Sequence, residues 1–340
     1  MVPFILFATL VVSGLLQASF AVPMKYFRGW RWEQVWVGQA LASNVVLPGI
    51  VLLAALMKRP AQFPGFSPEQ WLVLGTLGAV WGAGGIGYGL SLVLLGISFT
   101  YSLVFSATAL AGAILPLALG WNAPPARPTW FICGLALCLA GTFTLARAGA
   151  RRENEQGPEA DGRNQLPVPV HRLPYAAALL MALVAGVFSS GLGLALAWGE
   201  GLVREMTRGG VSPVIAPLVV WIPAFLGSAL VTMAYGLWCS VRSDSLPAFW
   251  RATPDWNWML VSAMGILGFG GMALYGIGAT AHRHLPENVA WGIYMSSFIL
   301  SGNLLGVLAK EWRGCSRRTY FLFGGGVTLL LAAIASLAWA

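Results

Sequence analysis

Carboxylates are the side chains best suited to binding and releasing a proton, and this chain of 340 residues holds only 12 Asp and Glu. Glu287 is the most notable, because it opens an apolar stretch directly after a cluster of His282, Arg283 and His284. Two interpretations stay open. The helix dipole favours a carboxylate at a helix N-terminus, so Glu287 could be a simple cap. Alternatively, it is a protonatable group that couples proton binding to substrate binding. On the second interpretation, Glu287 is the predicted proton-coupling residue.

The other carboxylates are expected to have simpler roles. Glu200 also lies at the edge of an apolar stretch. Glu33 is expected to be solvated at such an edge, and Glu311 to belong to an ion pair beside its neighbour Lys310. His282 and His284 could relay protons, although solvation in a loop is the commoner role for such residues.

The polar groups that the apolar stretches do contain are amides and aromatic rings with a hydrogen-bonding tip. Tyr and Trp present an apolar face and one polar atom, which suits a neutral, hydroxylated ligand such as a sugar. A phosphate or dicarboxylate would fit badly, because no Lys or Arg lies deep in these stretches. The predicted substrate-binding residues are Gln17, Lys25, Asn44, Trp81, Tyr88, Tyr101, Tyr275, Trp291, Tyr294 and Asn303. Trp198 and Trp221 have the same character, and Lys25 could reach inward or snorkel to the interface instead.

Two adjoining stretches between Trp71 and Gly120 must position several of these residues. Neither contains an Asp, Glu, Lys, Arg or His, and each exceeds the roughly 20 residues that a membrane-spanning helix needs. The pairs Gly78/Gly82 and Gly85/Gly89 have the small-xxx-small spacing that allows close helix packing. Trp81 and Tyr88 are seven residues apart and therefore share a helix face. We expect this face to contact substrate, the alternative being tight helix packing alone.

Composition sets the class of protein. The chain is 57% hydrophobic and 9% charged, whereas soluble domains are about 25% charged, so it is predicted to be an integral membrane protein with the lipid bilayer as its surroundings. The net charge of +8 comes from Lys and Arg in short loops, which set orientation in a membrane and do not indicate nucleic-acid binding. Four Cys without a C-x-x-C pair and three His give no metal site. No cofactor or enzyme motif is found, so the chain is predicted not to be an enzyme.

The expected fold is all-α, with ten transmembrane helices arranged as two inverted five-helix repeats. The expected spans are one ending near Pro23, then 34–57, two within 71–120, 129–145, 174–198, 213–238, 258–281, 287–308 and 320–340. A polar, flexible linker at 147–173 separates a first half, 1–146, from a second, 174–340. An odd number of spans makes two halves inverted. A weak internal echo relates Gly84-x3-Tyr88-Gly89 to Gly271-x3-Tyr275-Gly276.

Orientation follows from the basic residues. With the N-terminus outside, 14 of the 20 Lys and Arg fall in cytoplasmic loops. Basic loops stay on the cytoplasmic side, so both termini are predicted outside and the linker inside.

Five motifs, spread over nearly the whole chain, carry a family resemblance: VPMKYFRGWRWE at 22–33, AVWGAGGIGYGL at 79–90, LGIS at 95–98, GVFSSGLGLAL at 186–196 and LAKEWRG at 308–314. With these the sequence resembles the L-rhamnose–proton symporter family of the drug/metabolite transporter superfamily. The resemblance implies a ten-helix inverted-repeat carrier of the bacterial inner membrane that imports a 6-deoxyhexose with protons.

The resemblance also assigns residues. The family's aromatic-glycine motif falls on Trp81, Gly82, Gly84, Tyr88 and Gly89, its lysine after the first span on Lys25, and the acidic residue that starts its ninth span on Glu287. Two other functions stay open: a drug/metabolite-type carrier or exporter of another small metabolite, and a non-transporting membrane scaffold or sensor.

Overall fold

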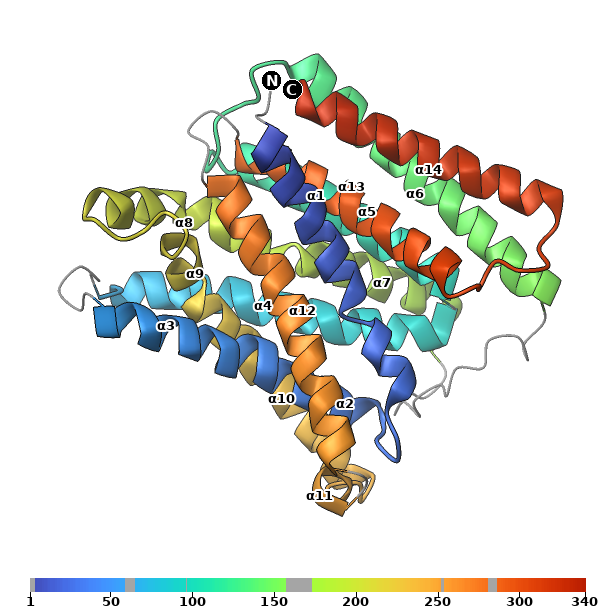
Figure 1. Ribbon diagram of the computed structural model, residues 1–340, viewed down its shortest axis with the longest axis horizontal. Helices are drawn as coiled ribbons and strands as arrows, with labels where there is room; N and C mark the ends of the chain where they lie inside the picture. Colours follow the sequence, from blue (N-terminus) through green and yellow to red (C-terminus); the bar gives the residue numbers. More distant parts are fainter. Residues whose placement is uncertain (1–3, 59–64, 96, 157–172, 252–253, 281–285) are drawn as a thin grey trace.

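The structure is a computed structural model that describes all residues except 1–3, 59–64, 96, 157–172, 252–253 and 281–285 (Figure 1). Within the described residues the chain is helical and contains no strand. Ten of these helical segments are long and apolar enough to cross a membrane, as expected: Phe7–Tyr26, Trp32–Ala54, Pro68–Ser91, Thr100–Ala118, Pro128–Gln156, Tyr175–Arg208, Ile222–Arg242, Asp255–Thr280, Glu287–Leu308 and Arg317–Ala338.

The helices follow the chain in the same order as the expected spans. The first five spans are built from α1 (Phe4–Ser19) with the 3-10 turn η1 (Val22–Tyr26), α2 (Trp32–Ala40) with η2 (Leu41–Val46) and α3 (Leu47–Lys58), α4 (Pro68–Leu95), α5 (Ile97–Ala118) and α6 (Pro128–Gln156). The other five use α7 (Tyr175–Ser189) with α8 (Gly191–Arg208), α9 (Ala216–Val220) with α10 (Ile222–Arg242), α12 (Pro254–Thr280), α13 (Glu287–Leu308) and α14 (Arg317–Ala338), while α11 (Ala248–Arg251) is a short connecting helix.

Three spans are interrupted helices. In the second span η2 is a π-helical turn directly before Pro48. Pro48 has no N–H with which to bond the carbonyl of Asn44, which explains why the α-helical pattern fails there. The sixth span breaks at Ser190, between α7 and α8, and the first breaks between α1 and η1. The short helix α9 precedes the seventh span and is separated from α10 by Trp221.

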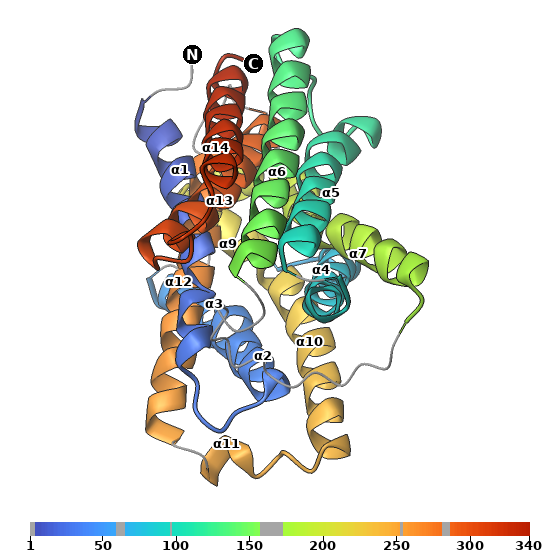
Figure 2. The same cartoon turned by 90° about the vertical axis from the view of Figure 1, so that its right-hand side faces the viewer.

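The helix α6 corrects the prediction that a flexible linker begins at residue 147. It continues to Gln156, so the first ten residues of the predicted linker are helical. They are held there by Glu155, whose carboxylate accepts hydrogen bonds from the Ser316 backbone N–H at 2.8 Å and from Thr319 Oγ1 at 2.8 Å, at the start of α14. As Figures 1 and 2 show, α6 and α14 run side by side. Residues 157–172 lie outside the described part of the chain.

Close packing around α4 confirms one of the two predicted glycine pairs. A Cβ at Gly78 would overlap the backbone of Ala224, and one at Gly82 would lie 2.8 Å from the Ser228 carbonyl oxygen, so these glycines bring α4 against α10. The pair Gly85/Gly89 does not act in this way. A Cβ at Gly85 would meet nothing within 4 Å, because that position faces open space, and Gly89 lies against the indole of Trp32.

Candidate substrate and proton site

The carboxylate of Glu287 is buried at the start of α13, with 4% of the residue exposed. Its Oε1 accepts a hydrogen bond from the Tyr275 hydroxyl of α12, and its Oε2 accepts one from Asn122 Nδ2 at 3.1 Å. Among the described residues it forms no ion pair with a Lys or Arg. Its side chain makes no capping bond to its own helix, whose N-cap is Pro286. Glu287 is therefore held by donors from two other segments; His282, Arg283 and His284 lie outside the described residues.

Asn122 reaches Glu287 because of the way α5 ends. Gly120 adopts a φ of +70°, a conformation that favours glycine. The backbone N–H groups of Trp121 and Asn122 then turn back to the carbonyl of Pro116, at 2.9 and 3.3 Å. This is the glycine-terminated helix end in which the N–H two residues beyond the cap returns to the last turn. It fixes the backbone of Trp121 and Asn122, from which the Asn122 side chain reaches Glu287.

Aromatic side chains from five helices and the α9–α10 junction join Glu287 to the middle of the protein. From Tyr275, ring contacts lead through Tyr294 (4.7 Å between centroids) to Phe298 (6.4 Å) along α13. They continue to Phe105 on α5 at 4.8 Å and then to Tyr88 on α4 at 5.4 Å.

A second path leads from Tyr275 back to α4. Tyr275 stacks on Trp221 at 6.0 Å, Trp221 contacts Phe225 at 5.9 Å, and Phe225 meets Trp81 at 6.1 Å. Both paths therefore start at Tyr275 and end on α4, one at Tyr88 and the other at Trp81. We call these side chains the aromatic network: Trp81, Tyr88, Phe105, Trp221, Phe225, Tyr275, Tyr294 and Phe298, with Tyr101 and Trp291 attached to it.

Trp291 shows how tightly this network is packed. A Cβ at Gly112 on α5 or at Gly193 on α8 would overlap its indole, so the ring lies between two glycines. Its Nε1 donates to the Thr108 carbonyl at 3.2 Å. The structure thus brings together six of the predicted substrate-binding residues: Trp81, Tyr88, Tyr101, Tyr275, Trp291 and Tyr294.

Four predicted residues lie in other surroundings. Asn44 is buried in η2, where its Nδ2 donates to Ser228 Oγ at 3.2 Å and its Oδ1 accepts from Ser43. The Oε1 of Gln17 is buried without a hydrogen-bond partner among the described residues. Asn303 donates to the Ile299 carbonyl of its own helix at 2.9 Å.

Lys25 is not brought to the aromatic network. Its Nζ pairs with Glu311 Oε1 at 2.6 Å, and the second carboxylate oxygen of Glu311 pairs with Arg152 at 2.9 Å. The predicted ion pair of Glu311 thus exists, but Lys25 and Arg152 supply it where the neighbouring Lys310 was expected. This group lies beyond the C-terminal end of α13, whereas Glu287 is at its start.

Sequence reasoning missed several residues of the site. Phe105, Phe225 and Phe298 have no polar tip, and a search for amphipathic rings passes over them. Asn122 lies between two apolar stretches, where nothing in the sequence relates it to Glu287. Glu33 was expected to be solvated, yet it is 0% exposed: it pairs with Arg31 at 2.9 Å and accepts from Ser243 at 2.9 Å, because α10 and the segment after it cover it.

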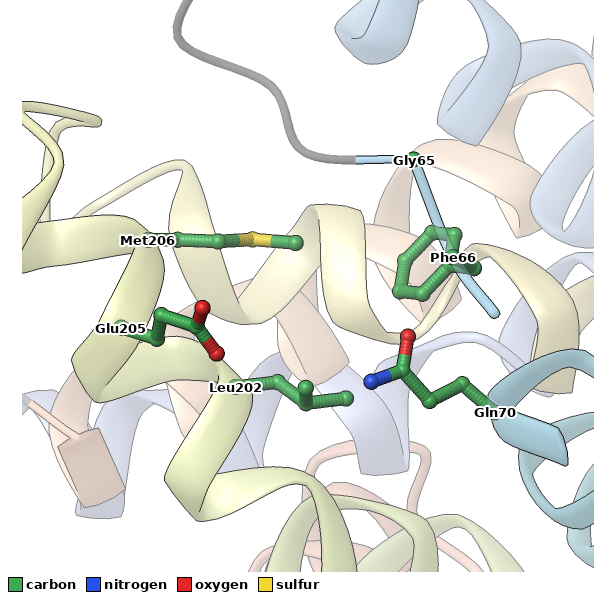
Figure 3. Close-up of a pocket in the computed structure, with 6 residues that line it drawn as sticks. All are labelled: Gly65, Phe66, Gln70, Leu202, Glu205 and Met206. Carbon is green, nitrogen blue, oxygen red and sulfur yellow. The ribbon is translucent and has the colours of Figure 1, made fainter.

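Two pockets flank the C-terminal half of α8. The smaller, of about 90 Å³, lies between α8 and the segment that leads into α4 (Figure 3). It is lined by Gly65, Phe66, Gln70, Leu202, Glu205 and Met206. The larger, of about 460 Å³, lies between α8 and the α5–α6 connection, and is lined by Trp121, Ala197, Trp198, Glu200, Gly201, Arg204 and Arg208.

The described residues form ten membrane-length helices around a buried carboxylate and an aromatic network, which is the architecture of a multi-pass membrane carrier. The model of the L-rhamnose-proton symport protein (RhaT) family matches residues 4–340, and the chain belongs to this family.

Named relatives agree with this assignment, and a solved structure shares the fold. The L-rhamnose-proton symporter of Cronobacter sakazakii is 26% identical over 95% of this chain and 93% of its own length. The L-rhamnose-proton symporter of Escherichia coli is 26% identical over 95% of this chain and 94% of its own. A solved crystal structure of another protein superposes on this chain with a TM-score of 0.62 at 18% identity. The superposition covers 98% of both chains, which shows that the two share a fold.

Proposed function

We propose that this chain imports L-rhamnose, or a closely similar 6-deoxyhexose, together with protons. The observation that carries the proposal is the position of Tyr275. Its hydroxyl donates to the buried carboxylate of Glu287, while its ring contacts Trp221, Trp291 and Tyr294 in the aromatic network. One side chain therefore contacts both the buried carboxylate of Glu287 and the rings suited to a sugar.

Coupling between the proton and the sugar follows from this shared residue. When Glu287 gains or loses a proton, the hydrogen bond to Tyr275 changes in strength, because charge-assisted hydrogen bonds are stronger than neutral ones. A change at Tyr275 alters the rings that it contacts. By reciprocity, sugar held against those rings changes the affinity of Glu287 for its proton. Gln17, with its unpartnered buried Oε1, is proposed as a further hydrogen-bonding group for the sugar.

Helix packing supports the inverted-repeat arrangement of the drug/metabolite transporter superfamily. If α1, α4, α5 and α6 correspond to α7, α12, α13 and α14, two of the major helix contacts have counterparts. The contact of α4 with α7 matches that of α12 with α1, and α5 with α7 matches α13 with α1. The echo of Tyr88 in Tyr275 fits the same relation, since both rings belong to the aromatic network. We propose two halves on this basis, the first ending with α6 at Gln156 and the second formed by residues 174–340.

The distribution of Lys and Arg along the chain supports both termini outside, and the bacterial relatives support a location in the inner membrane. An even number of spans places the termini at one end of the molecule, as Figure 1 shows. The backbone N–H of Arg127, in the α5–α6 connection beside Asn122, donates to the carbonyl of Ala340 at 2.9 Å. Glu287 therefore lies toward the outer face, from which an importer takes its protons.

The test is uptake of labelled L-rhamnose into energised membrane vesicles that contain the protein, with and without a proton uncoupler. We expect accumulation against a gradient that the uncoupler abolishes. An absence of L-rhamnose uptake would contradict the proposed substrate, and uptake indifferent to the uncoupler would contradict the coupling. The alternative carrier of another metabolite is not favoured, because the family model covers nearly the whole chain.

A further inference from the structure

The larger pocket beside α8 is separate from the aromatic network and has the dimensions of a ligand site. Its volume of about 460 Å³ lies within the roughly 300–1,000 Å³ typical of small-molecule sites. The α5–α6 connection supplies Trp121, fixed by the turn at Gly120, and α8 supplies Trp198 and the charged side chains. The pocket lies at the end of the molecule that carries both termini.

The lining has the chemistry that binds a neutral sugar. Two indoles, Trp121 and Trp198, offer flat apolar faces for the C–H groups of a pyranose ring. On α8, after Trp198, Glu200 and Arg204 form an ion pair of 2.8 Å, and its oxygen and nitrogen atoms can accept from and donate to hydroxyl groups. The carboxylate makes this a poor site for an anion.

The pocket adjoins the proton site through two residues. Trp121 directly precedes Asn122, whose Nδ2 donates to Glu287 at 3.1 Å. Glu200 is close enough to Glu287 for the two carboxylates to interact electrostatically. A ligand in the pocket therefore contacts the neighbours of Glu287 without contacting the aromatic network itself.

We propose that this pocket is an outer capture site, which binds the sugar before it reaches the aromatic network. The inference rests on the proposed function and adds a second, peripheral sugar site built on Trp121, Trp198 and the Glu200–Arg204 pair. Occupation of this site changes the surroundings of Glu287 before the sugar moves inward.

Cysteine labelling tests the site directly. A Cβ at Gly201, in the pocket lining, would meet nothing within 4 Å, so Gly201→Cys fits without a clash. Gly65 lines the smaller pocket across α8 and also has open space around it, which makes Gly65→Cys the matched control. Both are made in the full chain with Cys133 and Cys315, the two cysteines that are not buried, replaced by Ala, after uptake in that background has been shown to be normal.

Intact cells are treated with a membrane-impermeant maleimide, with and without L-rhamnose. We expect L-rhamnose to slow the labelling of Gly201→Cys at least fivefold and to leave Gly65→Cys unchanged. Adding Trp198→Leu to Gly201→Cys should raise, at least tenfold, the L-rhamnose concentration needed to protect the cysteine from labelling.

Three results would overturn the capture site in a chain that still transports L-rhamnose. In the first, L-rhamnose does not slow the labelling of Gly201→Cys. In the second, L-rhamnose protects both cysteines equally, which indicates a general closure of the protein. In the third, Trp198→Leu leaves the protection of Gly201→Cys unchanged. Reaction of Gly201→Cys from the inner face alone would also overturn it. Failure of the unsubstituted protein to take up L-rhamnose refutes the proposed function instead, so the two failures are distinguishable.

Discussion

Replacing Glu287 by Gln separates proton coupling from sugar binding. The surroundings can accept the amide. Gln Oε1 can accept from the Tyr275 hydroxyl as Glu287 Oε1 does, but its NH₂ would face the Nδ2 of Asn122. The Oδ1 of Asn122 is buried without a partner. Rotation of the Asn122 amide by half a turn therefore lets Oδ1 accept from the new NH₂.

The cost to stability should be small. Two hydrogen bonds to a charged acceptor, at about 1.5–3 kcal/mol each, become two neutral ones at about 0.5–1.5 kcal/mol, while the desolvation of a buried charge is removed. The cost to coupling should be complete, since a Gln does not titrate. An inward gradient of about one pH unit is worth about 1.4 kcal/mol per proton, enough for roughly tenfold accumulation in a one-to-one symport.

The assay compares two modes of transport in proteoliposomes. Under an imposed pH gradient, the unsubstituted protein should accumulate L-rhamnose roughly tenfold, and Glu287→Gln should reach equal concentrations inside and outside. Exchange of labelled for unlabelled sugar without a gradient should persist in both. Glu205→Gln, at an exposed carboxylate on α8, is the matched control. Gradient-driven accumulation by Glu287→Gln would refute the coupling role and leave Glu287 as a structural residue. Loss of exchange as well would refute the separation of the two functions.

Two further predictions concern α4. Tyr88→Phe removes one hydroxyl from the aromatic network and should raise the KM for L-rhamnose uptake roughly two- to twelvefold. This factor corresponds to the loss of a neutral hydrogen bond of about 0.5–1.5 kcal/mol. An unchanged KM in both Tyr88→Phe and Trp81→Ala would show that neither residue contacts the sugar. Gly78→Ala places a Cβ on the α10 backbone and should lower the thermal unfolding midpoint in detergent by several degrees, since overpacking costs about 1–3 kcal/mol or more. Gly85→Ala, with open space around it, should leave the midpoint equal or higher, and the reverse order would contradict the packing.

The ten spans could be predicted because their signal is local. Length and apolar composition decide whether a helix crosses a bilayer, and both can be read within about 20 residues. Close helix packing at Gly78 and Gly82 was also predicted from spacing, although the spacing did not identify α10 as the partner. The equivalent spacing of Gly85 and Gly89 does not bring a second helix backbone close, since Gly85 has nothing within 4 Å and Gly89 meets the side chain of Trp32.

The surroundings of Glu287 and Glu33 could not be predicted in this way. Asn122 is 165 residues from Glu287, and Ser243 is 210 residues from Glu33. Their meeting depends on how whole helices pack. A carboxylate at the edge of an apolar stretch is solvated or buried according to which distant segment covers it. The same reason explains Phe105, Phe225 and Phe298, whose importance comes from bridging rings on other helices.

The helix α13 links the two charged groups that distinguish the ends of the molecule. It begins at Glu287, and three residues after its last residue, Leu308, Glu311 holds Lys25 and Arg152. Its 22 residues span about 33 Å as an α-helix. A carrier that exposes its site to one side and then the other must break contacts at each end in turn. Because a helix moves largely as a rigid body, a shift of α13 when Glu287 changes its proton also changes the strain on the Glu311 ion pairs. In the proposed mechanism, the helix that carries the proton site is thus connected to the ion pairs at the opposite end of the molecule.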